Sequence, residues 1–316
     1  MRLVVQNDKS RARGVSRTAS GTSSGTWARG GLAVLLVAAL ASGCAQDTAE
    51  VRGAPGPQPL QAPPARALDT YASRLHAAQA ARTAAAERWN LGQVPLTAPP
   101  PPAKKPEITA REGFEVDGQE DLPPVFTTVP TKERILFLTI DDGAEKDPAF
   151  LRMMSELKIP YTVFLTDDEI KDDYGYFEEM QDRGVTLNSH TLSHPYLPAL
   201  SYAQQKHEIC GMQEVIEKRY GKRPALFRPP FGNYNRDTLR AAKSCGVKYA
   251  PIWNEEVYVD HWEYREWDRD LHPGDIVLTH FRGRDDWDGT MTDMVRRFLD
   301  RVTAEGYAVA RLEDYL

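Results

Sequence analysis

Leu138-Thr139-Ile140-Asp141-Asp142-Gly143 is the stretch around which the rest of this chain is organised. It continues an apolar run that starts at Ile135, and such a run bounded by a turn signal predicts a buried strand. Two adjacent carboxylates at the end of a buried strand repel each other unless a cation, a metal or a guanidinium compensates their charge. Asp-Gly is also a common turn dipeptide, so a polar strand-to-loop turn is the alternative for this stretch taken alone.

Composition limits what kind of protein this is. The chain has 316 residues, a net charge of -6 and 41% hydrophobic residues, enough for one sizeable domain plus extra segments or for two small domains. Because the charge is mildly acidic, we expect no nucleic-acid partner. The three cysteines, Cys44, Cys210 and Cys245, form no Cys-x-x-Cys pair, so a thiolate zinc site is not expected.

The N-terminal segment has the features of an export signal. Lys9 and several arginines precede a short aliphatic run, 32–40, which Ala41-Ser42-Gly43-Cys44 follows. The run is shorter than the roughly 20 residues that span a bilayer. A cysteine after small residues resembles a bacterial lipoprotein signal, although Ala41 stands where that signal usually has Leu. We assign 1–43 to a lipoprotein-type signal peptide and expect Cys44 to be lipidated; an ordinary secretory signal with an incidental cysteine is the alternative.

Residues 44–124 are rich in Pro and Ala and are interpreted as a spacer, with a possible helix over 68–90. Export would leave the folded part at the outer face of the cell membrane, held by a lipid anchor only, or secreted. From residue 125 to 316, strand-like and helix-like stretches alternate, which predicts a parallel sheet covered by helices. About seven such units over about 190 residues fit an α/β fold, a distorted and incomplete (β/α) barrel of about seven strands that is TIM-barrel-like.

The strands expected from this alternation cover 135–140, 161–165, 185–187, 226–227, 247–252, 276–278 and 307–312. The helices expected between them cover 148–157, 177–183, 201–220, 236–245 and 291–302. Ser201 and Gly221 are the start and stop signals of the long helix expected at 201–220.

Two histidines supply candidate metal ligands. His190 and His194 follow the strand expected at 185–187, and on a helix their spacing would place both on one face, where they can share a metal ion. Asp142 ends another strand, and active sites of β/α barrels gather at the C-terminal ends of strands. Two imidazoles and one carboxylate leave open positions for water, which is the ligand set of a catalytic zinc or ferrous site. Two unrelated surface histidines are the alternative.

Two further motifs follow expected strands. Arg228-Pro229-Pro230-Phe231-Gly232 has a backbone fixed by two prolines, which suits presentation of N–H groups, and Arg228 could pair with a carboxylate of the Asp pair. A structural turn with a solvated arginine is the alternative. His280 ends the strand expected at 276–278, whereas the remaining histidines fall in spacer, helix or loop contexts and are interpreted as structural: His76, His207, His261 and His272.

The four motifs, Thr-Ile-Asp-Asp-Gly, His-Thr-x-x-His, Arg-Pro-Pro-Phe and Leu-Thr-His, resemble in this order the polysaccharide deacetylases, the NodB-homology group or carbohydrate esterase family four. The resemblance covers about residue 125 to the C-terminus. It implies hydrolysis of N-acetyl groups on an amino-sugar polymer, with zinc or another divalent metal as cofactor. It further implies that Asp142, His190 and His194 bind the metal, that Asp141 is the general base and that His280 is the general acid. Arg228 would orient the base, and the Phe231 backbone N–H would bind the oxyanion.

The fourth family motif is poorly matched. Glu256 holds the place of the Asp that tunes the catalytic histidine, so the partner of His280 is open. Ile140 and Phe231 replace the usual Phe and Tyr. The aromatic residues around this motif, among them Trp253, Tyr258 and Trp262, could stack on sugars; simple packing is the alternative.

We therefore expect a monomeric deacetylase that acts on an N-acetylated glycan, and export and anchoring favour a glycan of the cell wall. No nucleic acid is expected as a partner, and contact with the membrane is expected through the lipid anchor only. A non-catalytic glycan-binding lipoprotein with a degenerate site is the second hypothesis. A glycosidase is disfavoured because adjacent carboxylates cannot easily flank a bond at the required separation of about 5 Å. The exported context also permits a disulfide between Cys210 and Cys245, on two helices that flank 226–227. Two buried free thiols are the alternative.

Overall fold

The computed structural model describes residues 65–116 and 121–316. Residues 1–43 and Cys44 lie outside these ranges, so the signal peptide and its lipidation stay predictions. Among the helices described, none combines the length and the apolar composition needed to cross a membrane.

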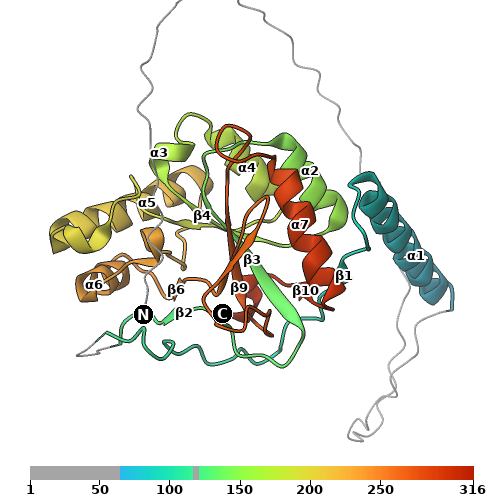
Figure 1. Cartoon of the computed structure of the whole chain (residues 1–316), viewed down its shortest axis with the longest axis horizontal. Helices are drawn as coiled ribbons and strands as arrows, with labels where there is room; N and C mark the ends of the chain where they lie inside the picture. Colours follow the sequence, from blue (N-terminus) through green and yellow to red (C-terminus); the bar gives the residue numbers. More distant parts are fainter. Residues whose placement is uncertain (1–64, 117–120) are drawn as a thin grey trace, which may run out of the picture. The chain divides into compact units, whose positions relative to one another are not determined.

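Strand β3 (Ile135–Asp142) is the centre of the fold (Figure 1). All of its residues are buried, which is why its sequence is a continuous apolar run rather than an alternating one. It pairs in parallel with three strands: β10 (Ala308–Val309), β9 (Ile276–His280) and β4 (Thr162–Leu165). Asp141 and Asp142 therefore end the longest strand of the described residues, and it is buried throughout.

Short strand pairings and single bridges extend the sheet on both sides of β3 and form the barrel wall. Strand β4 pairs with β5 (Leu187–Ser189), and two isolated parallel bridges, at Phe227 and at Leu226, lead from β5 towards β6. The remaining strands are β1 (Leu96–Thr97) beside β10, β2 (Val125–Phe126) beside β6 (Ala250–Pro251), and β7 (Glu255–Val257) between β9 and β8 (Trp262–Tyr264). The result is the distorted, incomplete (β/α) barrel predicted from the alternation. It contains ten strands within the described residues, where the alternation predicts about seven, because several are two-residue pairings.

Helices cover the outside of this wall (Figure 1). They are α2 (Pro148–Leu157), α3 (Asp167–Ile170), α4 (Tyr174–Asp182), α5 (Tyr202–Tyr220), α6 (Arg236–Ser244) and α7 (Met291–Ala304). Short 3-10 turns occupy Leu197–Ala199, Pro230–Gly232 and Leu312–Tyr315. The N-cap Ser201 shares a capping box with Gln204, and Gly221 ends α5 at a φ of 77°. The start and stop signals expected for the helix at 201–220 are thus confirmed.

The faces of β3 divide the core in two. Leu136, Leu138 and Ile140 pack with the helices in the largest hydrophobic cluster. Ile135 and Phe137 belong instead to a second cluster that fills the space between the strands. This alternation is the two-residue period of a strand, and it places the side chain of Asp141 on the inner face.

Helix α1 (Ala65–Arg88) corresponds to the helix expected at 68–90, with both ends two or three residues nearer the N-terminus. Its C-terminal end packs on the domain: Ala85 and Ala86 are buried, and Arg82 Nε donates to the Leu157 carbonyl at 3.2 Å. Trp89 Nε1 donates to Glu156 Oε2 at 2.8 Å. The compact unit accordingly begins at residue 69, well before the boundary at 125 expected from composition. The small alanine side chains, which the sequence analysis assigned to a spacer, allow α1 to pack closely against the rest of the domain.

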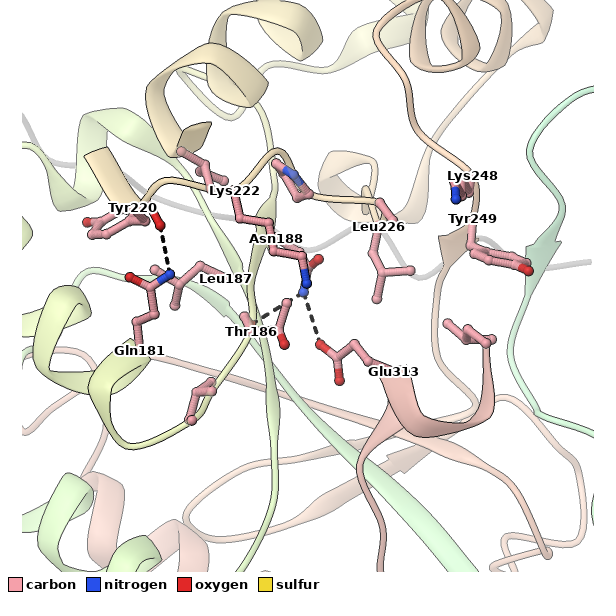
Figure 2. A pocket seen from close by; sticks show the side chains of 16 residues that line it. Gln181, Thr186, Leu187, Asn188, Tyr220, Lys222, Leu226, Lys248, Tyr249 and Glu313 are labelled. Carbon is pink, nitrogen blue, oxygen red and sulfur yellow. Dashed lines mark hydrogen bonds between the residues drawn. The ribbon is translucent and has the colours of Figure 1, made fainter. Parts of the chain in front are cut away.

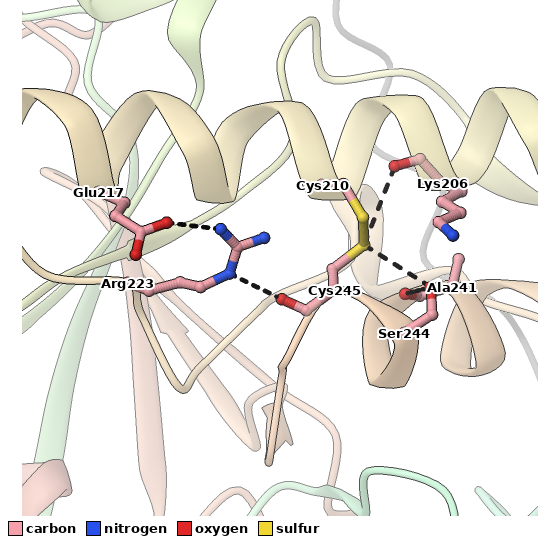
Figure 3. The surroundings of a disulfide bond; sticks show 7 residues. All are labelled: Lys206, Cys210, Glu217, Arg223, Ala241, Ser244 and Cys245. Carbon is pink, nitrogen blue, oxygen red and sulfur yellow. Dashed lines mark hydrogen bonds and ion pairs between the residues drawn. A yellow bond between two sulfur atoms is a disulfide. The ribbon is translucent and has the colours of Figure 1, made fainter.

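A disulfide joins Cys210 of α5 to Cys245, the C-cap of α6, across a sequence separation of 35 (Figure 3). The two Cα atoms are 5.0 Å apart. Arg223 supports the same corner, because its Nε donates to the Cys245 carbonyl at 3.1 Å while Nη1 contacts Glu217 at 2.6 Å. The bridge fixes the two helices that flank the short 226–227 segment.

One hollow of about 500 Å³ opens beside the start of β5 (Figure 2). Asn188 Nδ2 there donates to Glu313 Oε1 at 3.3 Å, and Lys222, Tyr220 and Tyr249 also line it. Burial raises the pKa of Glu313. The predicted site residues follow the ends of strands, so this hollow is not the candidate active site.

Candidate active site

The four motifs meet at one end of the barrel. Asp141 and Asp142 end β3, His280 ends β9, and the register of the two parallel strands places Asp141 beside His280. His190 follows β5, and Arg228 follows the bridge between Ser189 and Phe227. The carboxyl ends of parallel strands share one edge, which is why residues far apart in sequence come together here.

Three side chains form a candidate metal centre. Asp142 Oδ1 lies 3.7 Å from His190 Nε2 and 3.5 Å from His194 Nε2. The ligand atoms of the three residues all lie within 4.8 Å of one another. Asp142 Oδ1 is buried and accepts no hydrogen bond. A buried carboxylate oxygen without a partner is costly, and a cation bound between this oxygen and the two imidazoles would remove that cost. This donor set fits a divalent metal such as zinc.

His190 is oriented for metal binding. Its Nδ1 lies 2.7 Å from the Arg228 carbonyl, so Nδ1 carries the proton and Nε2 presents its lone pair to the centre. Burial, and then the nearby His194, lower the pKa of His190, which keeps the ring neutral as a ligand must be.

The histidine pair does not lie on a helix, so that part of the sequence interpretation is wrong. Residues 190–194 form a loop in which Thr191 and His194 have φ angles of 77° and 55°. Glu208 of α5 holds this loop, because its carboxylate accepts from the backbone N–H groups of Leu192 and Ser193 at 3.1 and 2.9 Å. The ring centroids of the two histidines are nevertheless 4.8 Å apart. A loop tied to α5 thus brings together what a helix was expected to align.

Backbone strain gathers at this end of the barrel. Seven non-glycine residues of the described chain have positive φ, and four of them are Asp142, Thr191, His194 and Phe231. Gly143, at a φ of 105°, follows directly; a Cβ there would lie 2.5 Å from Ile170 Cγ2. Such conformations persist where the surrounding structure holds functional groups in place.

Asp141 is paired with a fully buried guanidinium. Arg228 Nη1 donates to Asp141 Oδ1 at 2.8 Å, and Arg228 Nε donates to the Pro251 carbonyl at 3.0 Å. The guanidinium also lies 4.3 Å from the centroid of the Phe164 ring. Burial raises the pKa of Asp141 to about 7, against the lowering effect of Arg228. The carboxylate can therefore exchange a proton near neutral pH.

Arg282 was missed by the sequence interpretation. Its Nη2 donates to Asp142 Oδ2 at 2.8 Å, on the oxygen that does not face the histidines. Burial opposes the charge of Asp142, but His280, Arg282 and the histidine pair outweigh it and lower the pKa of Asp142 to about 2. The position of Arg282, two residues beyond His280 at the end of a strand, was the available signal.

His280 has a carboxylate partner. Its Nδ1 lies 3.3 Å from Glu256 Oε1, and the parallel register of β7 and β9 sets Glu256 opposite Leu278. Burial raises the pKa of Glu256, while the charge of His280 lowers it. The side chain of Glu256, although longer than that of Asp, still reaches His280. Glu256 is thus the carboxylate partner of His280 that the poorly matched motif left open.

The three aromatic residues lie in different surroundings. Trp253 packs against the core, and a Cβ on Gly232 would lie 3.1 Å from its ring. Tyr258 stacks on His261 at a centroid distance of 4.3 Å. Trp262 stacks on Phe298 of α7 at 6.0 Å. Packing therefore accounts for Trp262, and Trp253 is the member nearest to the Arg228 segment, 5.7 Å from its guanidinium.

Comparison with known proteins identifies the family. Residues 128–250 match the family model of polysaccharide deacetylases. An uncharacterized protein of Streptomyces coelicolor is 38% identical over 220 residues, which cover 68% of this chain and 86% of that protein. The chain belongs to the polysaccharide deacetylase family.

Two further relatives extend the comparison. The peptidoglycan-N-acetylmuramic acid deacetylase PdaA of Bacillus subtilis is 27% identical, over 59% of this chain and 73% of its own. The solved structure of a family 4 carbohydrate esterase from Bacillus anthracis is 28% identical, with a TM-score of 0.51 over 60% of this chain and 86% of that one. The deacetylase fold predicted from four short motifs is confirmed.

Proposed function

We propose that this deacetylase is a metal-dependent hydrolase that removes N-acetyl groups from amino sugars of cell-wall peptidoglycan. The observation that carries the proposal is the set of Asp142, His190 and His194 donors beside an Asp141 carboxylate held by Arg228. The name of the Bacillus subtilis relative, a peptidoglycan deacetylase, supports the class of substrate.

Each residue of the candidate site has a separate role in the proposed amide hydrolysis. Asp142, His190 and His194 would hold the metal, and zinc is the best fit to two imidazoles and one carboxylate. A bound metal of this kind polarises the acetyl carbonyl and lowers the pKa of water. Asp141 takes the proton of the attacking water, and Arg228 orients its carboxylate. His280, oriented by Glu256, gives a proton to the leaving nitrogen.

Phe231 supplies the remaining contact. Its backbone, at a φ of 60° and a ψ of 9°, follows two prolines, and its ring lies 4.6 Å from that of His194. The Phe231 N–H donates to the developing oxyanion, a role that uses the backbone and tolerates Phe in place of Tyr. Trp253 and Tyr258 are proposed to contact the glycan.

Location follows from the substrate. A cell-wall glycan lies outside the cell, so the proposal includes export of the chain and attachment of a monomer to the membrane by a lipid on Cys44 only. Metabolic labelling with a fatty acid, compared between the natural chain and a Cys44→Ser variant, tests the anchor. Label on both chains would reject it.

Acetate release tests the function. We expect zinc-loaded enzyme to release acetate from defined peptidoglycan oligomers, and separate oligomers acetylated only on glucosamine or only on muramic acid will identify the sugar. Asp141→Asn is the matched inactive control. Binding of the oligomers without acetate release would favour a non-catalytic glycan-binding lipoprotein, and new reducing ends would indicate a glycosidase.

A further inference from the structure

A second cluster of metal-binding side chains lies at the other ends of the strands. Glu255 is the first residue of β7, and His272 and Asp275 precede β9, whereas the deacetylase site follows the strand ends. One ligand atom from each of the three residues lies within 4.8 Å of the others. Glu255 and Asp275 are 1% and 0% exposed, so two carboxyl groups are enclosed side by side.

Asp275 is held by donors on both oxygens. Its Oδ1 accepts from Thr128 Oγ1 at 2.8 Å and from Asn254 Nδ2 at 2.7 Å. Its Oδ2 accepts from the backbone N–H of His272 at 2.8 Å. These bonds fix the orientation of the Asp275 carboxyl group beside Glu255.

Glu255 has no such support. Both of its carboxyl oxygens are buried and accept no hydrogen bond, although they face the Asp275 carboxylate. The guanidinium that acts on Glu255 is that of Arg301, which pairs with Glu305 at 2.8 Å. Without a cation, burial and the charge of Asp275 raise the pKa of Glu255 to about 10. The pair must therefore hold either a proton or a metal ion.

The geometry of His272 suits a metal ion. Its Nδ1 lies 3.3 Å from Asp275 Oδ2, and its Nε2 lies 3.4 Å from Asp268 Oδ2. When Nε2–H donates to Asp268, Nδ1 presents a lone pair to the cluster, which is how a carboxylate orients a metal-binding imidazole. The His272 side chain is 43% exposed, so an ion can reach it from solvent.

We propose that Glu255, His272 and Asp275 bind a divalent cation of the zinc or manganese class. One imidazole and two carboxylates suit these ions, and the ion would neutralise the unpartnered carboxyl group of Glu255. The site would join β7 to the loop before β9. It is separate from the deacetylase site and does not depend on the proposed function.

Zinc content tests the proposal on the full chain without an affinity tag. The starting variant is His190→Ala/His194→Ala, which lacks the ligands of the candidate catalytic metal. After dialysis against zinc chloride and then buffer, we expect one zinc ion per chain. Adding His272→Ala should remove it, whereas adding His261→Ala should not, because His261 is a half-exposed histidine outside the cluster. No zinc in the starting variant, or zinc retained with His272→Ala, overturns the proposal.

A second set of variants separates a metal from a shared proton. Glu255→Gln keeps the shape of the side chain and removes its charge, so a metal site should bind zinc at least tenfold more weakly. Asp268→Asn should weaken zinc binding about tenfold through the orientation of His272. A shared proton predicts that zinc leaves the melting temperature of the starting variant unchanged, and this result would also reject the site. These readouts serve equally if His272→Ala does not fold.

Discussion

Reduction of the Cys210–Cys245 disulfide should cost this deacetylase about 4 kcal/mol of unfolding free energy. The bridge closes a loop with a sequence separation of 35. In the chain-entropy model a loop of this length removes about 13 cal/mol/K from the unfolded ensemble, or about 3.8 kcal/mol at 25 °C. For a domain of this size the loss corresponds to a melting temperature lower by about 8 to 16 °C.

Urea unfolding followed by tryptophan fluorescence measures this difference. A Cys44→Ser chain leaves only the two cysteines of interest, and it is unfolded with and without a thiol reductant at a fixed zinc concentration. Comparing oxidised with reduced chains keeps the same atoms at the buried position of Cys245. A Cys210→Ser/Cys245→Ser variant is the control and should not respond to the reductant. The oxidised chain should also show the smaller m-value, because its unfolded state exposes less surface.

Two results would refute this reasoning. Free energies that agree within about 1 kcal/mol would show that loop closure does not control stability here. Two free thiols in the unfolded, unreduced chain would reject the bridge itself.

Three further predictions concern single side chains. Asp142→Ala should lower the zinc content by one equivalent and abolish acetate release, and unchanged zinc content would remove Asp142 from the ligand set. Asp141→Asn should keep that zinc but lower kcat at least a hundredfold, because the amide cannot accept a proton; near-normal kcat would contradict the base role. Burial opposes the charge of Asp293, but hydrogen bonds from Thr290 outweigh it and lower the pKa to about 2. Since the folded pKa lies below the unfolded value of about 4, Asp293 stabilises above that pH and loses its effect as the pH falls towards 2. Asp293→Asn should therefore cost about 0.5 kcal/mol of unfolding free energy at pH 7, a small value because the side chain is 34% exposed and solvent screens its charge. A difference in unfolding free energy between the two chains that does not narrow from pH 6 to pH 3 would contradict this assignment.

Much of the fold could be predicted because its signals are local. Pro148–Leu157 is helical over the expected residues, and the Ser201 and Gly221 caps enclose α5 as predicted. Short pairings such as β1 (Leu96–Thr97) and β2 (Val125–Phe126) escaped prediction, because a two-residue contact depends on neighbours distant in sequence. The packing of Ala85 and Ala86 escaped for the same reason, since an alanine-rich helix shows no strong apolar stripe.

The order of the motifs predicted the site, but local spacing did not predict its geometry. His190 and His194 have the spacing of one helix face, yet the Glu208 carboxylate of the next α-helix, α5, holds the loop that carries them. The position of Arg282 just beyond His280 was a weak signal in the sequence, and its role follows from its contact with Asp142. Spacing identifies which residues can meet, whereas the backbone between them is decided by tertiary contacts.

Two carboxylate doublets show how position in a strand changes the chemistry of adjacent residues. Glu255 and Glu256 lie in the extended backbone of β7, so they point to opposite faces: Glu256 meets His280, and Glu255 meets Asp275. Asp141 and Asp142 end β3, where a φ of 76° at Asp142 breaks the alternation. Both aspartates then lie near one imidazole, at 3.6 and 3.7 Å from His190 Nε2. A doublet at the start of a strand thus serves two separate sites, while a doublet at its end can place a proton acceptor beside a metal ligand.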